Sequence, residues 1–330
     1  ITLHTPLTEK TKNIINKESF SIMKKGVRIV NCARGGLVDE DALKENLESG
    51  HVASAALDVF VNEPPKDSPL LGTKNLIMTP HLGASTTEAQ EKVALQVAEQ
   101  ISDYLKTGAI TNAVNTFSLT AKEYNTVQPY LKLSEHLGGF AGQLTENAIK
   151  KIHIEFEGAV SQVNTQPLVQ TIICSLLKSN FDGVNVINSV AVAKTKSIEI
   201  SETKHEKTSE YQTCVTLTIE TEKQTRSVSG TLFGGKPRIV NIKGIKIEAE
   251  LAENNLYISN QDKPGFISDL SKILADNKIN IATFNLGRKE SGGEAIALIS
   301  TDNPIDEKVI DEIKKIPLVI QAKPLTFNGS

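Results

Sequence analysis

The sequence has few cysteines and no arrangement of them that builds a site. Cys32, Cys174 and Cys214 are the only three in 330 residues, and no two have a Cys-x-x-Cys spacing. An odd number of isolated cysteines argues against disulfides and structural zinc, and it favours a reducing compartment such as the cytoplasm. The histidines also lack metal-ligand spacing, so we expect no metal.

An excess of one charge is also missing. The chain has 36 basic and 39 acidic side chains, a net charge of −3. Without a basic excess we expect no nucleic-acid partner. No apolar run approaches the roughly 20 residues that cross a bilayer, and no signal peptide is visible, so we expect no membrane association. The length and the 39% hydrophobic content predict two or three domains with ordinary cores.

What is present is a set of three polar residues at similar places in a repeated pattern. Each follows a short apolar run typical of a buried strand: Arg34 after Val27–Val30, Glu63 after Val52–Leu57 and His81 after Leu76–Met78. In an open α/β sheet the loops after the carboxyl ends of the strands form the ligand crevice. We therefore expect the three side chains to converge on one cleft.

The three residue types fit the oxidation of a hydroxy acid. A guanidinium grips a carboxylate through a bidentate fork, which Lys cannot reproduce. His is the usual base for removing a hydroxyl proton near neutral pH, and a neighbouring carboxylate fixes its tautomer and stabilises imidazolium. Taken singly, Arg34 could instead be an exposed loop charge, Glu63 a turn carboxylate and His81 a loop histidine with ordinary partners. Their joint placement after three successive strands favours a site.

The surrounding motifs resemble one family. They are His4-Thr5-Pro6-Leu7-Thr8, Val30-Asn31-Cys32-Ala33-Arg34-Gly35-Gly36, Ala56–Phe60 with Glu63-Pro64, and Pro80-His81-Leu82-Gly83-Ala84. In this order, over residues 1 to about 115, they resemble the D-isomer-specific 2-hydroxyacid dehydrogenases. The resemblance implies that Arg34 anchors the substrate, that Glu63 pairs with His81 and that His81 is the acid/base.

The same resemblance implies NAD as the cofactor. The residues expected to line its nicotinamide half are Thr5, Cys32, Ala33, Arg34, Asp58, His81, Leu82, Gly83 and Ala84. A nucleophilic role for Cys32 is the alternative to this cofactor contact. The family's Gly-x-Gly-x-x-Gly turn occurs nowhere in the chain, which begins at Ile1 apparently inside a strand. We therefore expect an amino-terminally truncated chain that is inactive alone.

The predicted fold is α/β, and residues 1–84 are expected to be the second half of a doubly wound, Rossmann-like domain. Asn16 and Asp39 are expected to cap its helices. The capping-box pattern Ser85-Thr86-Thr87-Glu88 predicts another helix, with apolar residues at period four. Residues 85–117 would return the chain toward the missing substrate lobe, which would leave an apolar face of this helix bare.

Residues 118–249 are predicted to form an α+β domain. A helix is expected from Pro129 to Leu144, and alternation around Ile154 predicts a strand. Thr231–Val240 resembles the signature of the intervening, allosteric substrate-binding type of domain in long-form phosphoglycerate dehydrogenases. Three cations in this region could bind an anion or form a solvated charged hairpin: Lys236, Arg238 and Lys243.

Residues 252–330 show a βαββαβ order, the ferredoxin-like plan. Asp262-Lys263-Pro264-Gly265-Phe266 and Asn280-Ile281-Ala282 resemble the ACT regulatory domain. The resemblance implies a homo-oligomer through paired ACT domains, with a small amino acid, L-serine, bound near Asp262 and Asn280. These two residues could otherwise be only a helix cap and a strand-entry residue.

The order of the three parts is that of the long-form phosphoglycerate dehydrogenases. It implies NAD-dependent oxidation of 3-phosphoglycerate to 3-phosphohydroxypyruvate, the first step of serine biosynthesis. Two alternatives stay open, another 2-hydroxyacid or 2-oxoacid reductase and a non-enzymatic NAD-sensing regulator on the same fold. A third is that the chain is only a regulatory fragment.

Overall fold

The computed structural model describes residues 1–207 and 210–327. The chain divides into two compact units, residues 1–102 and 103–330. No helix in the described ranges is long and apolar enough to cross a membrane.

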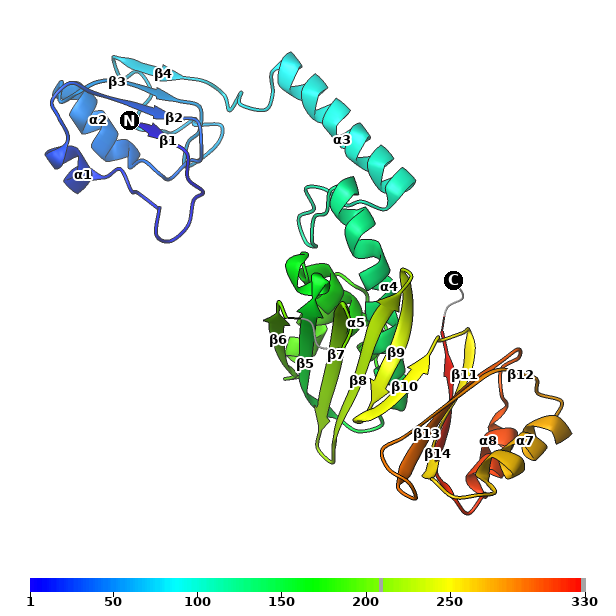
Figure 1. Ribbon diagram of the computed structural model, residues 1–330. Coiled ribbons are helices and arrows are strands. Elements are labelled where there is room, and N and C mark those ends of the chain that lie inside the picture. The colour runs from blue at the N-terminus through cyan, green and yellow to red at the C-terminus, as the bar shows by residue number, and fades with distance from the viewer. Residues whose placement is uncertain (208–209, 328–330) are drawn as a thin grey trace. The chain divides into compact units, whose positions relative to one another are not determined.

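The first unit is built on a parallel sheet (Figure 1). Its strands, in the order β1-β2-β3-β4, are β1 (Thr2–Leu3), β2 (Val27–Asn31), β3 (Val52–Leu57) and β4 (Leu76–Met78). Helix α1 (Lys17–Ile22) connects β1 to β2, and α2 (Glu40–Glu48) connects β2 to β3. All strands run the same way, so their carboxyl ends meet at one edge of the sheet.

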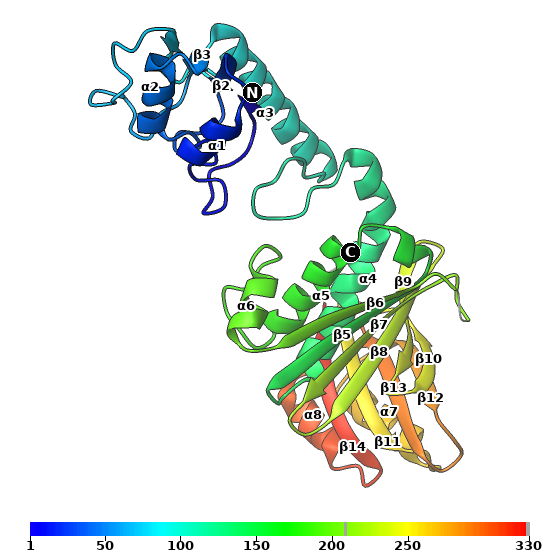
Figure 2. The same ribbon diagram turned by 90° about the vertical axis from the view of Figure 1, so that its left-hand side faces the viewer.

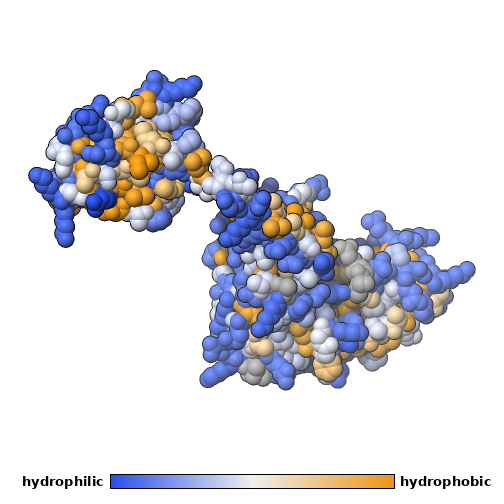
Figure 3. Space-filling model, turned by 90° about the horizontal axis from the view of Figure 1, so that it is seen from above, coloured by the Kyte–Doolittle hydropathy of each residue, from blue (hydrophilic) through white to orange (hydrophobic). Residues whose placement is uncertain are grey.

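The two helices cover one face of this sheet. Their apolar side chains share a core with residues of the strands: Phe20, Leu43 and Leu47 with Ile29, Ala55 and Leu57. The predicted caps are confirmed, because Asn16 accepts a bond from the amide of Ser19 and Asp39 accepts one from Ala42. On the opposite face Val30 and Ile77 remain 38% and 67% exposed. Figure 3 shows hydrophobic residues gathered on the surface of this unit.

Helix α3 (Thr87–Thr107) follows the sheet and buries none of its residues. The capping prediction was one residue out. The Thr86 hydroxyl, rather than that of Ser85, accepts the amide of Ala89 at 3.2 Å.

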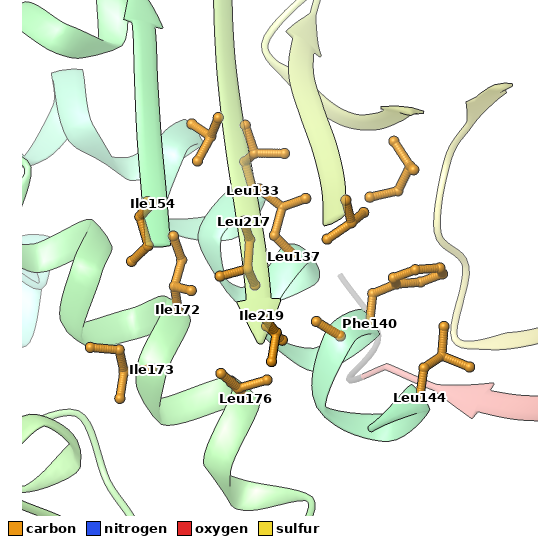
Figure 4. Close-up of a cluster of buried hydrophobic side chains, with 14 of the residues drawn as sticks. Leu133, Leu137, Phe140, Leu144, Ile154, Ile172, Ile173, Leu176, Leu217 and Ile219 are labelled. Atoms are coloured by element: carbon orange, nitrogen blue, oxygen red, sulfur yellow. The ribbon is translucent and has the colours of Figure 1, made fainter. Parts of the chain in front are cut away.

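The second unit contains a mixed six-stranded sheet, ordered β10-β9-β8-β7-β5-β6 (Figure 2). Its strands are β5 (Ile149–Gly158), β6 (Glu199–His205), β7 (Thr213–Thr221), β8 (Thr225–Phe233), β9 (Lys236–Ile242) and β10 (Ile245–Ala249). Its helices are α4 (Ala121–Leu144), α5 (Gln166–Lys178) and α6 (Ser189–Thr195), with a 3-10 turn at Ala159–Gln162. Figure 4 shows apolar side chains of α4 and α5, such as Leu137 and Ile172, gathered against those of the strands, such as Leu217.

Helix α4 starts earlier than its sequence suggests. A helix beginning at Pro129 was expected, but the helix begins at Ala121, after a capping box between Thr120 and Glu123. Pro129 lies inside it. The helix therefore continues through a residue that normally interrupts one, because packing of its buried face outweighs local propensity.

The carboxyl-terminal segment has the expected βαββαβ order. It comprises β11 (Asn254–Gln261), α7 (Phe266–Asp276), β12 (Ile281–Arg288), β13 (Glu294–Thr301), α8 (Glu307–Lys314) and β14 (Val319–Thr326). The antiparallel sheet has the order β12-β13-β11-β14, and α7 and α8 share a core with one of its faces. This is the predicted ferredoxin-like plan.

The other face of this sheet is not free. Its side chains belong to the same hydrophobic core as α4 and the six-stranded sheet: Tyr257, Ile296, Leu298, Leu325 and Phe327. Gln143 of α4 also exchanges two 2.9 Å bonds with the backbone of Thr326. The segment 252–327 and the six-stranded sheet therefore share one continuous core.

Candidate active site

Three loops at the carboxyl ends of β2, β3 and β4 carry the residues expected to do chemistry. Arg34 follows β2, Glu63 follows β3 and His81 follows β4. The three strands are adjacent and parallel, so the loops lie at the same edge of the sheet. Their side chains are partly or largely exposed, as substrate-binding groups must be.

The loop carrying Arg34 is held by a buried asparagine. Asn31 is 1% exposed; its amide donates to the carbonyl of Arg34 at 2.9 Å and accepts the amide of Ala33 at 3.1 Å. The Arg34 guanidinium donates to the Ala33 carbonyl at 2.6 Å. The sequence analysis quoted Asn31 in the motif but gave it no role. An asparagine that ends an apolar run is the signal that could have identified this turn.

The loops carrying Arg34 and Glu63 are in direct backbone contact. A Cβ atom at Gly35 would lie 1.8 Å from the carbonyl oxygen of Phe60, so only glycine fits there. Glu63 in turn accepts the amide of Phe60 at 3.0 Å. The close approach joins the guanidinium loop to the carboxylate loop.

His81 is held in a left-handed backbone conformation, with φ of +54°. Non-glycine residues rarely adopt it, and where they do they cluster at functional sites. Asp58, which is 5% exposed, clamps the turn. It accepts bonds from the Thr79 hydroxyl at 2.6 Å, the Leu82 amide at 2.7 Å and the Gly83 amide at 3.0 Å. The Thr79 bond, supported by the two amides, holds the pKa of Asp58 below its ordinary value, although burial opposes this.

Glu63 and His81 meet directly. The Nδ1 atom of His81 lies 2.7 Å from Oε2 of Glu63. This bond, and then the one from the Phe60 amide, holds the pKa of Glu63 below its ordinary value. Glu63 is therefore a carboxylate at neutral pH and can only accept, so Nδ1 of His81 carries the proton. The Nε2 atom is left as the nitrogen that can take a proton from a substrate.

Arg34 forms no ion pair with either partner of this couple among the described residues. Its charge therefore remains available for a carboxylate ligand at the same sheet edge.

The residues expected to line the cofactor site fall into two groups. Cys32, Ala33 and Thr5 lie after the ends of β2 and β1, and Cys32 is an exposed free thiol. Leu82, Gly83 and Ala84 follow His81 in the same turn. The amides of Leu82 and Gly83 are already used by Asp58.

This donor set fits the nicotinamide end of a dinucleotide. A carboxylate offers about four lone-pair sites, and Asp58 uses three of them, so one remains for a carboxamide N–H. The chain carries no Gly-x-Gly-x-x-Gly turn for the pyrophosphate.

The two expected effector residues are not brought together within one chain. The amide of Asp262 bonds to Gly293, just before β13, whereas the carbonyl of Asn280 bonds to Asp302, just after β13. They thus lie at opposite ends of a strand that is eight residues long, roughly 25 Å. Their side chains have other partners: Asp262 pairs with Arg288 at 2.7 Å and Asn280 donates to Asp302 at 2.7 Å.

Two of the three cations considered for anion binding have carboxylate partners. Arg238 pairs with Glu250 at 3.0 Å, and Lys243 pairs with Glu294 at 3.6 Å. Lys236 begins β9 beside an exposed hairpin turn.

Comparisons with known proteins agree with these three parts. Residues 1–83 match the NAD binding domain of the D-isomer specific 2-hydroxyacid dehydrogenases, residues 126–243 the D-3-phosphoglycerate dehydrogenase intervening domain, and residues 255–318 the ACT domain. Residues 1–83 are therefore similar to one domain of the D-isomer specific 2-hydroxyacid dehydrogenases.

Over nearly its whole length the chain is similar to D-3-phosphoglycerate dehydrogenases. It is 40% identical over 327 residues to the enzyme of Bacillus subtilis, covering 98% of this chain and 62% of the relative. It is 39% identical over 320 residues to that of Methanocaldococcus jannaschii, covering 96% and 60%. A solved NAD-dependent formate dehydrogenase from Staphylococcus aureus, in complex with NAD, is 36% identical over 34% of each chain, with a TM-score of 0.30. The chain thus spans about 60% of the length of its curated relatives.

Proposed function

We propose that the chain is part of a D-3-phosphoglycerate dehydrogenase, which oxidises 3-phospho-D-glycerate to 3-phosphohydroxypyruvate with NAD. The observation that carries the proposal is the 2.7 Å bond between His81 and Glu63, at the same sheet edge as Arg34. The domain order shared with the named relatives supports this substrate over other hydroxy acids.

Each residue then has a defined task. Arg34 binds the substrate carboxylate through its guanidinium fork, which orients the adjacent carbinol. His81 accepts the hydroxyl proton at Nε2, while Glu63 holds the proton on Nδ1 and stabilises the imidazolium. Bound NAD supplies the acceptor for the hydride that leaves C2 with the electron pair of the C–H bond. Thr5, the backbone of Cys32–Arg34, Asp58 and the turn 81–84 would hold its nicotinamide half.

The proposal is tested by turnover. The full-length protein that contains this sequence is expected to reduce NAD with 3-phosphoglycerate, faster than with D-lactate or D-glycerate. The 330-residue chain alone is expected to give no turnover, because no segment of it supplies a pyrophosphate-binding glycine turn. Turnover of another 2-hydroxy acid only would favour another reductase, and cofactor binding without turnover would favour a sensor.

We further propose regulation through the carboxyl-terminal domain. Asp262 and Asn280 lie at opposite ends of one sheet, so one chain cannot close a small site from both. Two ACT domains related by a two-fold axis would place Asp262 of one copy beside Asn280 of the other. We propose a homo-oligomer of this kind with L-serine as its effector. The carboxylate of Asp262 would bind the ligand's ammonium, and Asn280 would donate to and accept from its polar groups.

Three assignments follow from the same resemblance and are part of the proposal. The functional divisions are residues 1–84, 85–117, 118–249 and 252–330. A cytoplasmic location is supported by three free cysteines. NAD is the proposed cofactor because residues 1–83 are similar to an NAD binding domain.

A further inference from the structure

Glu40, the first residue of α2, contacts the loop that carries Glu63 on both sides of that residue. Its Oε1 accepts the amide of Val61 at 2.9 Å, and its Oε2 accepts the hydroxyl of Ser68 at 2.7 Å. Val61 comes two residues before Glu63, and Ser68 comes five after it. One carboxylate therefore fastens the loop at two points.

The support under Glu40 is rigid. Asp39 caps α2 through the amide of Ala42, and its own amide donates to Ile15 at 2.8 Å. Leu43 and Leu47, one turn and two turns further on, are buried in the core under the sheet. The first turn of α2 is thus fixed to the sheet whose loops carry Arg34, Glu63 and His81.

The loop is anchored in the core by Phe60 and Leu70, which are 5% and 0% exposed, but the stretch between them has less apolar support. A hollow of about 440 Å³ lies between it and the start of α2, lined by residues 38–41 and by residues of the loop between 61 and 69. Val61 is 59% exposed. Between the two buried anchors, where packing is less tight, the polar bonds of Glu40 hold the loop.

We propose that Glu40 is a positioning residue that sets the place of Glu63 relative to His81 and Arg34. The arrangement is compact in sequence, because Arg34, the close approach at Gly35 and Glu40 lie within seven residues. The segment that carries the substrate anchor thus also carries the group that places the partner of the base. This inference rests on the proposed dehydrogenase function.

The alternative is that Glu40 serves only as an acid in the first turn of α2, where it interacts favourably with the helix dipole. Asp41 offers a matched control, since it lies in the same turn and is exposed. Under either role, replacing Glu40 with Ala is expected to cost some helix stability. Only the positioning role predicts that the titration of Glu63 also changes.

The experiment compares Glu40→Ala, Glu40→Gln and Asp41→Ala. The titration of the Glu63 carboxyl carbon is followed by NMR in the complete 330-residue chain, and kcat and KM are measured in the full-length protein that contains it. Glu40→Ala is expected to move the Glu63 titration up toward its ordinary range and to lower kcat roughly 10- to 100-fold, since small misplacements near the chemistry cost this much. KM for the hydroxy acid is expected to change little, because Arg34 keeps its own support from Asn31. Glu40→Gln is expected to restore most of both readouts, and Asp41→Ala to change neither.

Equal effects of Glu40→Ala and Asp41→Ala on the Glu63 titration would overturn the proposal. If Glu40→Ala fails to fold, Ser68→Ala removes one of the two fastenings more gently and must shift the titration in the same direction. A protein that shows no dehydrogenase turnover would defeat the proposed function, while the titration would still decide the role of Glu40.

Discussion

The imidazole of His81 and the carboxylate of Glu63 are joined by a 2.7 Å bond, although they lie in separate loops 18 residues apart. The bond leaves Nε2 as the only ring nitrogen that can act as a base.

His81→Ala should therefore lower kcat of the full-length protein roughly 10²- to 10⁴-fold, the usual worth of a positioned general base. His51→Ala is the control, because His51 bonds to the carbonyl of Phe20, away from the sheet edge that carries the site. Steady-state rates of NADH formation measure both variants. A kcat for His81→Ala within a few-fold of the wild type would remove His81 from its proposed role.

Arg34→Lys should mainly affect substrate use. The charge is kept, but the planar fork that grips a carboxylate is lost, so we expect KM to rise roughly tenfold or more. Arg28→Lys, at an exposed position on β2 of the same sheet, is the control. If both substitutions leave KM unchanged, Arg34 does not bind the substrate.

Much of the site was predictable because its residues follow the ends of strands closely in the sequence. Arg34, Glu63 and His81 each follow an apolar run, and the doubly wound rule places such loops together. The role of Glu40 could not be predicted in this way, because it acts through tertiary hydrogen bonds to Val61 and Ser68, 21 and 28 residues away. Asn31 bonds only within its own turn, to Ala33 and Arg34, so its role could have been read from the sequence.

The ferredoxin-like order was predictable from alternating strands and helices, whereas the use of both faces of its sheet was not. Tyr257 and Leu298 alternate along their strands with residues that face α7 and α8. This alternation indicates that both faces of the sheet are apolar, but it does not indicate which element covers the second face. Only the structure shows that their partners include Phe140 of α4. The sequence prediction placed the start of α4 at Pro129, because proline normally interrupts a helix, whereas the helix begins after the Thr120–Glu123 capping box.

The contact between β12 and β10 predicts that Gly287 cannot be replaced without a loss of stability. A Cβ atom at Gly287 would lie 2.3 Å from the carbonyl oxygen of Lys246, and backbone cannot move aside as a side chain can. Gly287→Ala should destabilise the second unit by about 1–3 kcal/mol, as overpacking of a well-packed interface does. Urea unfolding of the full chain, with Leu286→Ala at a 43% exposed neighbouring position as control, measures the effect. Equal midpoints for Gly287→Ala and the wild type would show that the two strands separate freely.

His136 predicts a pH-dependent stability. It is 8% exposed and packs against Phe327, with ring centroids 5.6 Å apart. Burial, helped by Lys132 and opposed by Glu250, lowers its pKa to about 4. The unfolded chain, with a histidine pKa near 6.5, binds the proton first. The contribution of His136 to the free energy of unfolding is therefore fully present above about pH 6.5, falls as the pH drops toward 4 and then levels off.

Between pH 7 and pH 5 this amounts to a loss of about 2 kcal/mol. His136→Leu should remove that part of the pH dependence, as measured by urea midpoints at the two pH values. His205→Leu, at an exposed position, is the control. A wild type and a His136→Leu variant with parallel pH profiles would contradict the assignment.

The opposite placement of Asp262 and Asn280 predicts that serine sites form only between copies. Asp262→Ala and Asn280→Ala should each abolish binding of L-serine to the full chain, measured by calorimetry, while sedimentation reports the oligomer. If each site takes one residue from each copy, mixing the two variants should restore about one quarter of the wild-type sites, because random hybrid dimers carry one intact site of two. The full chain is needed, because an isolated 252–330 fragment would expose Ile296, Leu298 and Phe327. Restored binding on mixing would support a shared site, whereas no binding after mixing would show that Asp262 and Asn280 do not form one serine site between two copies.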